Sequence, residues 1–132
     1  MATRSAIGIM YGDVCKSIYV HWDGYLEGVG VTLLENYGRV RASELIACGN
    51  VSSLHATIPE THFIDDSAEC LTTHSLSEFL DYYGSSWCEY FYIMGTDGQW
   101  YVTQGDEHLT LLSEALANER LERERSMYQE QE

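Results

Sequence analysis

Two stretches of the chain, one near each end, carry a turn signal between runs of strand-forming residues, and this arrangement restricts the fold most. The first spans residues 5–22 and turns at Gly12-Asp13. The second spans residues 87–103 and turns at Asp97-Gly98. Glycine and aspartate tolerate the backbone angles of tight turns, and Asp-Gly is a strong hairpin signal. We therefore predict two antiparallel β-hairpins.

The segments between and after the hairpins repeat apolar residues every three or four positions, as amphipathic helices do. Ser75 and Glu78 have the spacing of a capping box at the start of one of them. The fold class is therefore α+β, with an antiparallel sheet of about four strands (two hairpins) and three or four helices packed on one face. The other face of such a sheet is free to carry exposed aromatics. The expected helices cover residues 26–37, 40–48 and 76–83, followed by a last one that Asp106 caps and that carries Leu109, Leu112 and Leu116 on its inner side.

Residues 50–73 keep neither a helical nor a strand period. We expect an extended loop there, with one short strand around Phe63-Ile64. A structureless segment of this length is uncommon in a compact domain and is often functional.

The end of the chain differs from the rest in its charge pattern. Residues 1–117 are expected to form a single α+β domain, and residues 118–132 a charged helical extension or a frayed tail. In the extension, Glu119 and Arg123 have the four-residue spacing that stabilises a helix slightly. A polar tail and a helical arm for self-association, which would give a homodimer, both fit this pattern.

The chain carries 21 acids and 7 bases, a net charge of −14, and no base lies between residues 42 and 119. This charge opposes direct binding to nucleic acid or to an anionic membrane, so we expect neither. No apolar run reaches the roughly 18 residues of a membrane span, and the first residues lack the pattern of a signal peptide. The four cysteines form no CxxC pair. A cytoplasmic protein with free thiols is therefore expected.

The base-free acidic stretch favours a positively charged protein partner, because crowded carboxylates steer a basic surface into contact. Tyrosines beside the acids add contact area at low entropic cost. The expected contact residues are Asp65, Asp66, Glu69, Asp81, Glu89, Tyr90 and Tyr92. The alternative is that these acids only solvate the surface.

A second candidate site lies where polar and aromatic side chains follow one another near the end of the first hairpin. The pattern favours a structural role, with Trp22 in the core and Asp23 in the turn. The first alternative is a small-molecule pocket lined by Tyr19, His21, Trp22, Asp23 and Tyr25. The second is a hydrolase in which Asp23 holds His21 as a general base. The chain has no nucleophile motif and no glycine-rich phosphate loop, so we expect no enzymatic activity and no cofactor.

A possible zinc set lies in the irregular segment and consists of His55, His62, Cys70 and His74. The step from Cys70 to His74 approaches the spacing of zinc ligands, but the interval between the first two histidines is not diagnostic. We therefore predict no metal site.

Several segments of the chain are similar to those of small bacteriophage and prophage proteins of uncharacterised function. They are Thr3-Arg4-Ser5, Tyr19-Val20-His21-Trp22-Asp23-Gly24-Tyr25, Gly30-Val31-Thr32-Leu33-Leu34-Glu35-Asn36-Tyr37 and Gly98-Gln99-Trp100-Tyr101-Val102. The similarity covers the first third of the chain well, the second hairpin moderately and residues 50–73 poorly. It implies a context and no particular activity, because small acidic phage proteins are often inhibitors of host or defence proteins.

Charge and resemblance together lead to one hypothesis and one rival. We expect a phage accessory protein in the host cytoplasm that binds and inhibits a host protein with a basic surface, by occlusion or as a DNA mimic. The rival is a nucleotide-binding protein, a sponge for a signalling molecule, that uses the pocket at residues 19–25. An anionic ligand there would need a base nearby, and the candidates are Arg4, Lys16, Arg39 and Arg41.

Overall fold

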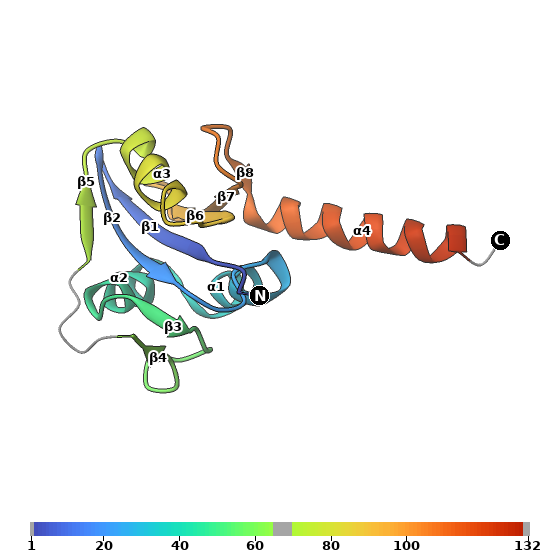
Figure 1. Ribbon diagram of the computed structural model, residues 1–132, viewed down its shortest axis with the longest axis horizontal. Coiled ribbons are helices and arrows are strands. Elements are labelled where there is room, and N and C mark those ends of the chain that lie inside the picture. Colours follow the sequence, from blue (N-terminus) through green and yellow to red (C-terminus); the bar gives the residue numbers. More distant parts are fainter. Residues whose placement is uncertain (1, 65–69, 131–132) are drawn as a thin grey trace.

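The computed structural model describes residues 2–64 and 70–130, which form one sheet flanked by helices (Figure 1). Within this part of the chain the strand order is β4-β3-β2-β1-β6-β7-β8, and β5 pairs with β2 beside this path. The strands are β1 (Ser5–Tyr11), β2 (Val14–Val20), β3 (Val51–Ser53), β4 (His62–Phe63), β5 (Leu71–Thr73), β6 (Tyr90–Met94), β7 (Trp100–Thr103) and β8 (Thr110–Leu111). The helices are the π-helix η1 (Leu26–Gly30), α1 (Val31–Asn36), α2 (Arg39–Ala47), α3 (Leu76–Gly84) and α4 (Leu112–Glu130).

The two predicted hairpins lie next to each other at the centre of the sheet. β1 and β2 pair antiparallel, with Ile7 opposite Ile18, and β6 and β7 pair antiparallel, with Tyr92 opposite Val102. The hairpins join through β1 and β6, which run parallel, and β2 is also parallel to β3. The α+β class is therefore confirmed. The prediction of a purely antiparallel sheet of about four strands was wrong, because the described residues form a mixed sheet of eight.

Helices cover both faces of the sheet, not one face as expected (Figure 1). On one face α1, α2 and the start of α4 lie over Ile7 and Tyr92. On the other face α3 packs through Phe79 on Phe91, with ring centroids 5.9 Å apart. The reason lies in the central strands, where Phe91 and Tyr92 point to opposite faces and are each at most 1% exposed. The sheet therefore has no exposed aromatic face over these strands.

Two of the predicted helices, α2 and α3, form where the sequence indicates, and the Ser75 hydroxyl accepts a 3.1 Å hydrogen bond from the Glu78 amide. The segment 26–37 divides into η1 and α1, because the backbone passes close to Asp23. The Val29 amide donates to the Asp23 carbonyl at 2.8 Å. A Cβ atom on Gly28 would lie 2.2 Å from the same carbonyl, so only glycine fits there.

The irregular segment 50–73 contains more structure than predicted. The strand near Phe63 is present as β4, but β3 and β5 are additional. Each of these strands has only two or three residues and is held by a neighbouring strand. Strands this short leave no periodic signal in the sequence.

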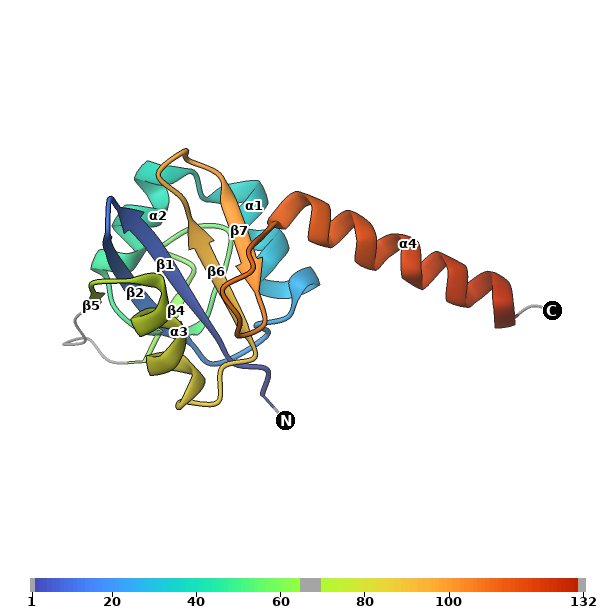
Figure 2. The same cartoon turned by 90° about the horizontal axis from the view of Figure 1, so that it is seen from above.

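The last helix, α4, leaves the sheet and projects outward (Figure 2). Leu112 and Leu116 are buried at its start, whereas Leu121 and Met127 are 51% and 59% exposed. Asp106 does not cap this helix and instead accepts a 3.0 Å hydrogen bond from the His108 amide in the preceding loop. Within the described residues, no helix combines the length and apolar character that a membrane crossing requires.

Candidate ligand-binding groove

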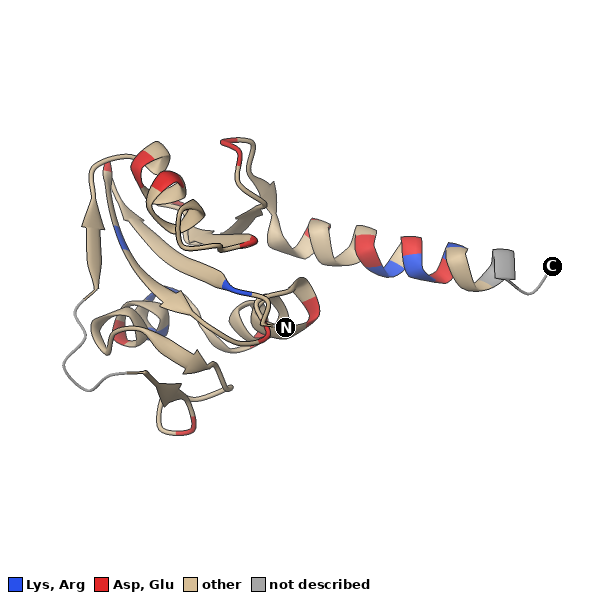
Figure 3. Ribbon diagram, viewed as in Figure 1, with Lys and Arg blue, Asp and Glu red and all other residues tan. Residues whose placement is uncertain are grey.

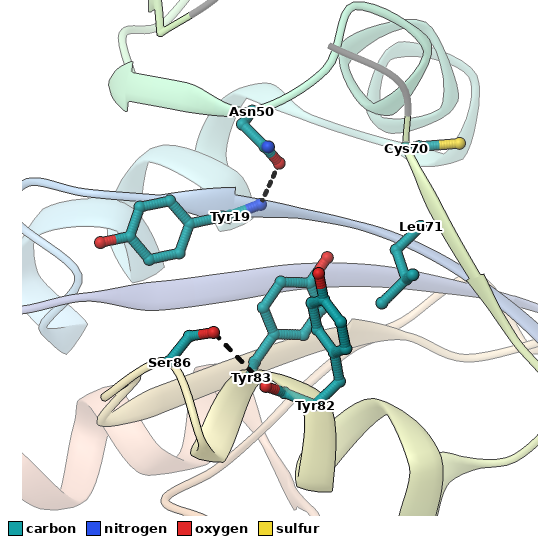
Figure 4. A pocket seen from close by; sticks show the side chains of 7 residues that line it. All are labelled: Tyr19, Asn50, Cys70, Leu71, Tyr82, Tyr83 and Ser86. Carbon is teal, nitrogen blue, oxygen red and sulfur yellow. Dashed lines mark hydrogen bonds between the residues drawn. The ribbon is translucent and has the colours of Figure 1, made fainter.

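A groove with a volume of about 420 Å³ runs between α3 and the edge of β2 (Figure 4). Its walls combine aromatic rings with polar groups, which is the usual composition of a small-molecule site. The residues that line it are Tyr19, Asn50, Cys70, Leu71, Tyr82, Tyr83 and Ser86. We call it the Tyr19 groove.

The groove forms where the pairing partner of β2 changes from β5 to β3. Residues Cys15 to Ser17 of β2 pair with β5, and Val20 pairs with β3. Between them, the backbone amide of Tyr19 is bound by a side chain, because the Asn50 Oδ1 accepts its hydrogen bond at 2.9 Å. This leaves a gap in the strand edge, and the Tyr19 ring lies beside it (Figure 4).

The opposite wall comes from α3. The hydroxyls of Tyr82 and Tyr83 both point toward β2, and the two rings meet nearly edge-on with centroids 5.0 Å apart (Figure 4). Tyr83 is fixed by Ser17, whose hydroxyl donates to it at 3.0 Å. Burial raises the pKa of Tyr83 well above its usual value, so this hydroxyl stays protonated. Tyr82 is 52% exposed and is available to a ligand.

The Tyr19 hydroxyl connects the groove to a polar cluster at the end of the sheet. It lies 2.8 Å from Nδ1 of His21, and the His21 ring packs edge-on against Trp22 at 4.7 Å. Burial raises the pKa of Tyr19, and the nearby Arg4 guanidinium opposes this shift by stabilising the phenolate. Burial also raises the pKa of Cys88 to about 12, and the charge of Arg4 opposes this shift too.

Arg4 is the cation of this cluster, and no carboxylate of the described residues forms an ion pair with it. Its backbone carbonyl accepts a 2.8 Å hydrogen bond from the Glu89 amide, which fixes it between β1 and β6. Its Nε atom is buried and has no hydrogen-bond partner among the described residues. The ion pairs in that part of the chain join Arg120 to Glu27 and Arg123 to Glu119. A buried guanidinium nitrogen without an acceptor is costly, so a bound anionic or carbonyl group would stabilise it.

The predicted pocket at residues 19–25 is only partly assembled. Tyr19 lines the groove, whereas His21 contacts the Tyr19 hydroxyl and packs against Trp22 without lining the groove itself. Asp23 and Tyr25 contact each other instead, with the Tyr25 hydroxyl donating to Asp23 at 3.3 Å. The expectation that Trp22 lies in the core was wrong, because this side chain is 44% exposed.

The other three candidate bases for an anion in this region are engaged or lie elsewhere. Arg41 is exposed and donates to the Asn36 carbonyl at 3.4 Å. Arg39 donates to the carbonyls of Met10 and Gly95 at 2.9 and 3.0 Å. Lys16 is exposed and lines a separate depression beside Tyr11. Of the four candidate bases, Arg4 is therefore the one that the fold places beside Tyr19.

The residues predicted to bind a basic partner differ in exposure where the structure describes them. Asp65, Asp66 and Glu69 lie outside the described residues. Asp81 and Glu89 are exposed, and Tyr90 is half-buried. The prediction for Tyr92 was wrong, because this side chain is fully buried and its hydroxyl donates to the Gly24 carbonyl at 2.6 Å.

The acids of the described residues are spread over the molecule (Figure 3). They lie on η1, α1, α2, α3 and α4, in the turns that follow β1 and β6, and in the loops that precede η1, β4, β6 and β8. The dense acidic face that the sequence suggested is therefore not formed by any one element. The described part of the molecule instead carries its acids on several separate elements.

Metal and redox sites are not assembled in this part of the chain. The rings of His55 and His62 lie 5.3 Å apart, but no group of three or more possible ligands is present among the described residues. The four cysteines are free, and Cys15 is buried whereas Cys48 is exposed.

Sequence reasoning missed most of the groove. Asn50, Tyr82, Tyr83 and Ser86 come from segments far from residues 19–25, and only the fold brings them together. Tyr82 and Tyr83 belong to a dense aromatic stretch, and that was the one signal available in the sequence.

Comparisons with known proteins identify no relative of this chain. No family model matches the chain, and neither a curated protein nor a solved structure matches it.

Proposed function

We propose that this protein binds a small, ring-bearing anionic molecule in the Tyr19 groove. The observation that carries the proposal is the buried Nε of Arg4, which has no hydrogen-bond partner among the described residues and whose guanidinium lies near Tyr19, a residue that lines the groove. A phosphate or carboxylate would satisfy that nitrogen by a charge-assisted hydrogen bond, which is among the strongest that proteins make.

The groove also contains groups that can bind a planar ring by stacking and by hydrogen bonding. Tyr19 and the half-exposed Tyr82 present aromatic surface, and stacking on such surface adds to affinity. Asn50 uses its Oδ1 to hold the Tyr19 amide, which leaves its NH₂ group as a donor toward a ring carbonyl or nitrogen. A nucleotide carries both an anionic group and such a ring.

The net charge of −14 does not exclude an anionic ligand. At physiological salt, exposed charges are screened beyond about 8 Å, so a local cation decides the potential in a cleft. No carboxylate of the described residues forms an ion pair with Arg4. A sponge for a signalling nucleotide is the biological role that fits such a site in a phage accessory protein.

The test is calorimetry and thermal shift with nucleoside monophosphates, cyclic nucleotides and the corresponding nucleosides. We expect binding that needs the phosphate and that weakens about tenfold or more in Arg4→Gln, which removes a charge-assisted hydrogen bond. Lys16→Gln is the matched control, because Lys16 is an exposed base on β2 outside the groove. Tyr82→Ala should weaken the binding of nucleosides and of nucleotides by the same factor.

Two results would overturn the proposal. One is the absence of a shift with every ligand of the panel. The other is binding that Arg4→Gln and Lys16→Gln weaken to the same extent, since a diffuse positive field and not the groove would then be responsible.

A second candidate function is the inhibition of a host protein with a basic surface. Among the described carboxylates, those of Glu27 and Glu119 form ion pairs, while others such as Asp81 and Glu89 are exposed without one. Unneutralised acids raise the association rate with a cationic protein.

This candidate predicts a partner whose capture from host lysate weakens as salt rises and which DNA displaces. Asp81→Asn with Glu89→Gln should weaken capture more than Asp13→Asn with Glu44→Gln, a pair of exposed acids that changes the charge equally. Equal weakening by the two pairs would show that net charge alone is responsible, without a specific contact surface.

A further inference from the structure

The Tyr19 groove has one basic side chain near it. The chain contains seven arginines and lysines, and the structure describes all of them. Three lie on α4, which projects away from the sheet (Figure 2). Arg39 and Arg41 donate to backbone carbonyls, and Lys16 lines a separate depression. Among the basic side chains, Arg4 is therefore the one that the fold places near Tyr19.

The wall that α3 contributes is electronegative. Tyr82 and Tyr83 belong to the last turn of α3, and Ser86 follows the end of this helix (Figure 4). Aligned peptide dipoles give the C-terminal end of a helix a partial negative charge. A basic side chain in the last turn often offsets this charge, but α3 has none there. This wall therefore disfavours any negative charge of a ligand beyond the one that Arg4 neutralises.

Two exposed carboxylates are adjacent to residues of the site. Asp81 directly precedes the lining residue Tyr82 on α3. Glu89 is fixed next to Arg4, because its amide donates to the Arg4 carbonyl at 2.8 Å. Neither carboxylate forms an ion pair with a described base. At physiological salt, exposed charges act over about 8 Å, so these acids repel a ligand charge that is left without a cation.

We propose that the ligand of the Tyr19 groove is a nucleoside phosphodiester with a single negative charge, such as a cyclic mononucleotide. This inference rests on the proposed function and names the class of nucleotide. One guanidinium neutralises one charge, whereas a phosphate monoester carries about −1.5 to −2 at pH 7 and further phosphates add to it. The groove volume of about 420 Å³ is at the small end of ligand pockets, which suits one nucleotide and not a cyclic dinucleotide with two phosphates.

The first test is calorimetry with adenosine, cyclic AMP, AMP and ADP at pH 8 and low ionic strength, with the guanosine series in parallel. We expect the cyclic nucleotide to bind most tightly. The uncharged nucleoside should bind more weakly because it leaves Arg4 without an anion. Each additional negative charge on the ligand should weaken binding about threefold or more, because groups several ångströms away repel it.

The second test uses the titration of the ligand. The phosphate of AMP loses its second negative charge on protonation near about pH 6, whereas cyclic AMP keeps one charge. The affinity for AMP relative to cyclic AMP should therefore increase about threefold or more between about pH 8 and about pH 5.5. Cyclic AMP serves as the reference for titration of the protein itself.

The third test assigns the preference to the acids near the groove. Asp81→Asn with Glu89→Gln should reduce the preference for cyclic AMP over AMP about threefold. Asp13→Asn with Glu44→Gln is the control, because it removes the same charge at exposed positions on elements that do not line the groove.

The outcomes separate this inference from the proposed function. Absence of binding by every ligand of the panel contradicts both. Binding of AMP and ADP that equals or exceeds that of cyclic AMP contradicts only the limit of one charge, and the groove then remains a nucleotide site. A preference that the two pairs of acid substitutions reduce to the same extent also overturns the inference, since net charge and not the groove would then select the ligand.

Discussion

The Ser17 hydroxyl donates a hydrogen bond of 3.0 Å to the Tyr83 hydroxyl, and this bond connects β2 to α3 within the core on the α3 side of the sheet. Both residues are buried, at 0% and 3% exposure. Both hydroxyl groups can therefore be buried, because each has the other as its hydrogen-bond partner. The same bond fixes one wall of the Tyr19 groove.

The first prediction concerns this bond. Tyr83→Phe keeps the ring and removes the hydroxyl, so the free energy of unfolding should fall by about 1 kcal/mol. Tyr82→Phe is the matched control, because the neighbouring side chain is half-exposed and should change stability by less than about 0.5 kcal/mol. Urea unfolding of the two variants measures the difference, and equal effects would mean that the Ser17 contact contributes nothing.

The second prediction concerns alkaline pH. Burial raises the pKa of the Cys15 thiol from 9.0 to about 11 and that of Cys88 to about 12, and it raises the pKa of Tyr83 and Tyr92. Each group stays protonated when folded, whereas the unfolded chain loses these protons first. The free energy of unfolding should therefore stay constant below about pH 9. Above that pH it should decrease by up to roughly 1.4 kcal/mol per pH unit for each titrating group.

Urea unfolding under reducing conditions at a series of alkaline pH values checks this decline. Cys15→Ala should lower stability at neutral pH because it leaves a cavity, but it should make the decline above pH 9 shallower. Cys48→Ala changes an exposed thiol and should leave the slope unchanged. A slope that neither variant alters would show that Cys15 does not contribute.

The parts of the fold that the sequence predicts are those whose signals are local. Gly12-Asp13 and Asp97-Gly98 place the turns of both hairpins, and Ser75 with Glu78 places the start of α3. Each signal acts within a few residues, so neighbouring sequence is enough to find it. The second hydrogen bond of the capping box differs from the motif. The Glu78 carboxylate accepts from the His74 amide at 2.6 Å and not from the Ser75 amide.

The parts that the sequence does not predict depend on contacts between distant segments. The parallel pairing of Ser5 with Tyr90 joins residues that no turn connects. Coverage of both sheet faces follows from this pairing, since it places Phe91 and Tyr92 in the centre of the molecule. The groove shares this origin, because Asn50 reaches Tyr19 only after β3 has aligned beside β2.

The third prediction tests the cap of α3. Ser75→Ala removes the acceptor for the Glu78 amide and should cost about 1 kcal/mol of stability. Ser77→Ala, inside the same helix at an exposed position, should be neutral or slightly stabilising, because alanine is the better helix former. Thermal and urea unfolding of the pair compares them, and a Ser75→Ala chain as stable as Ser77→Ala would contradict the capping role.

The fourth prediction concerns the π-helical turn at η1. A Cβ atom at Gly28 would lie 2.2 Å from the Asp23 carbonyl oxygen, and backbone atoms cannot yield cheaply, so Gly28→Ala should destabilise the chain by about 3 kcal/mol. Gly38→Ala is the control, because no atom lies within 4 Å of its added Cβ and the residue precedes α2 in an extended conformation. Gly38 is the N-cap residue of α2, where alanine is less favourable than glycine, so this variant should lose only about 1 kcal/mol. Circular dichroism and urea unfolding distinguish the two, and a Gly28→Ala chain as stable as Gly38→Ala would show that the close approach to Asp23 does not hold η1 in its π-helical form.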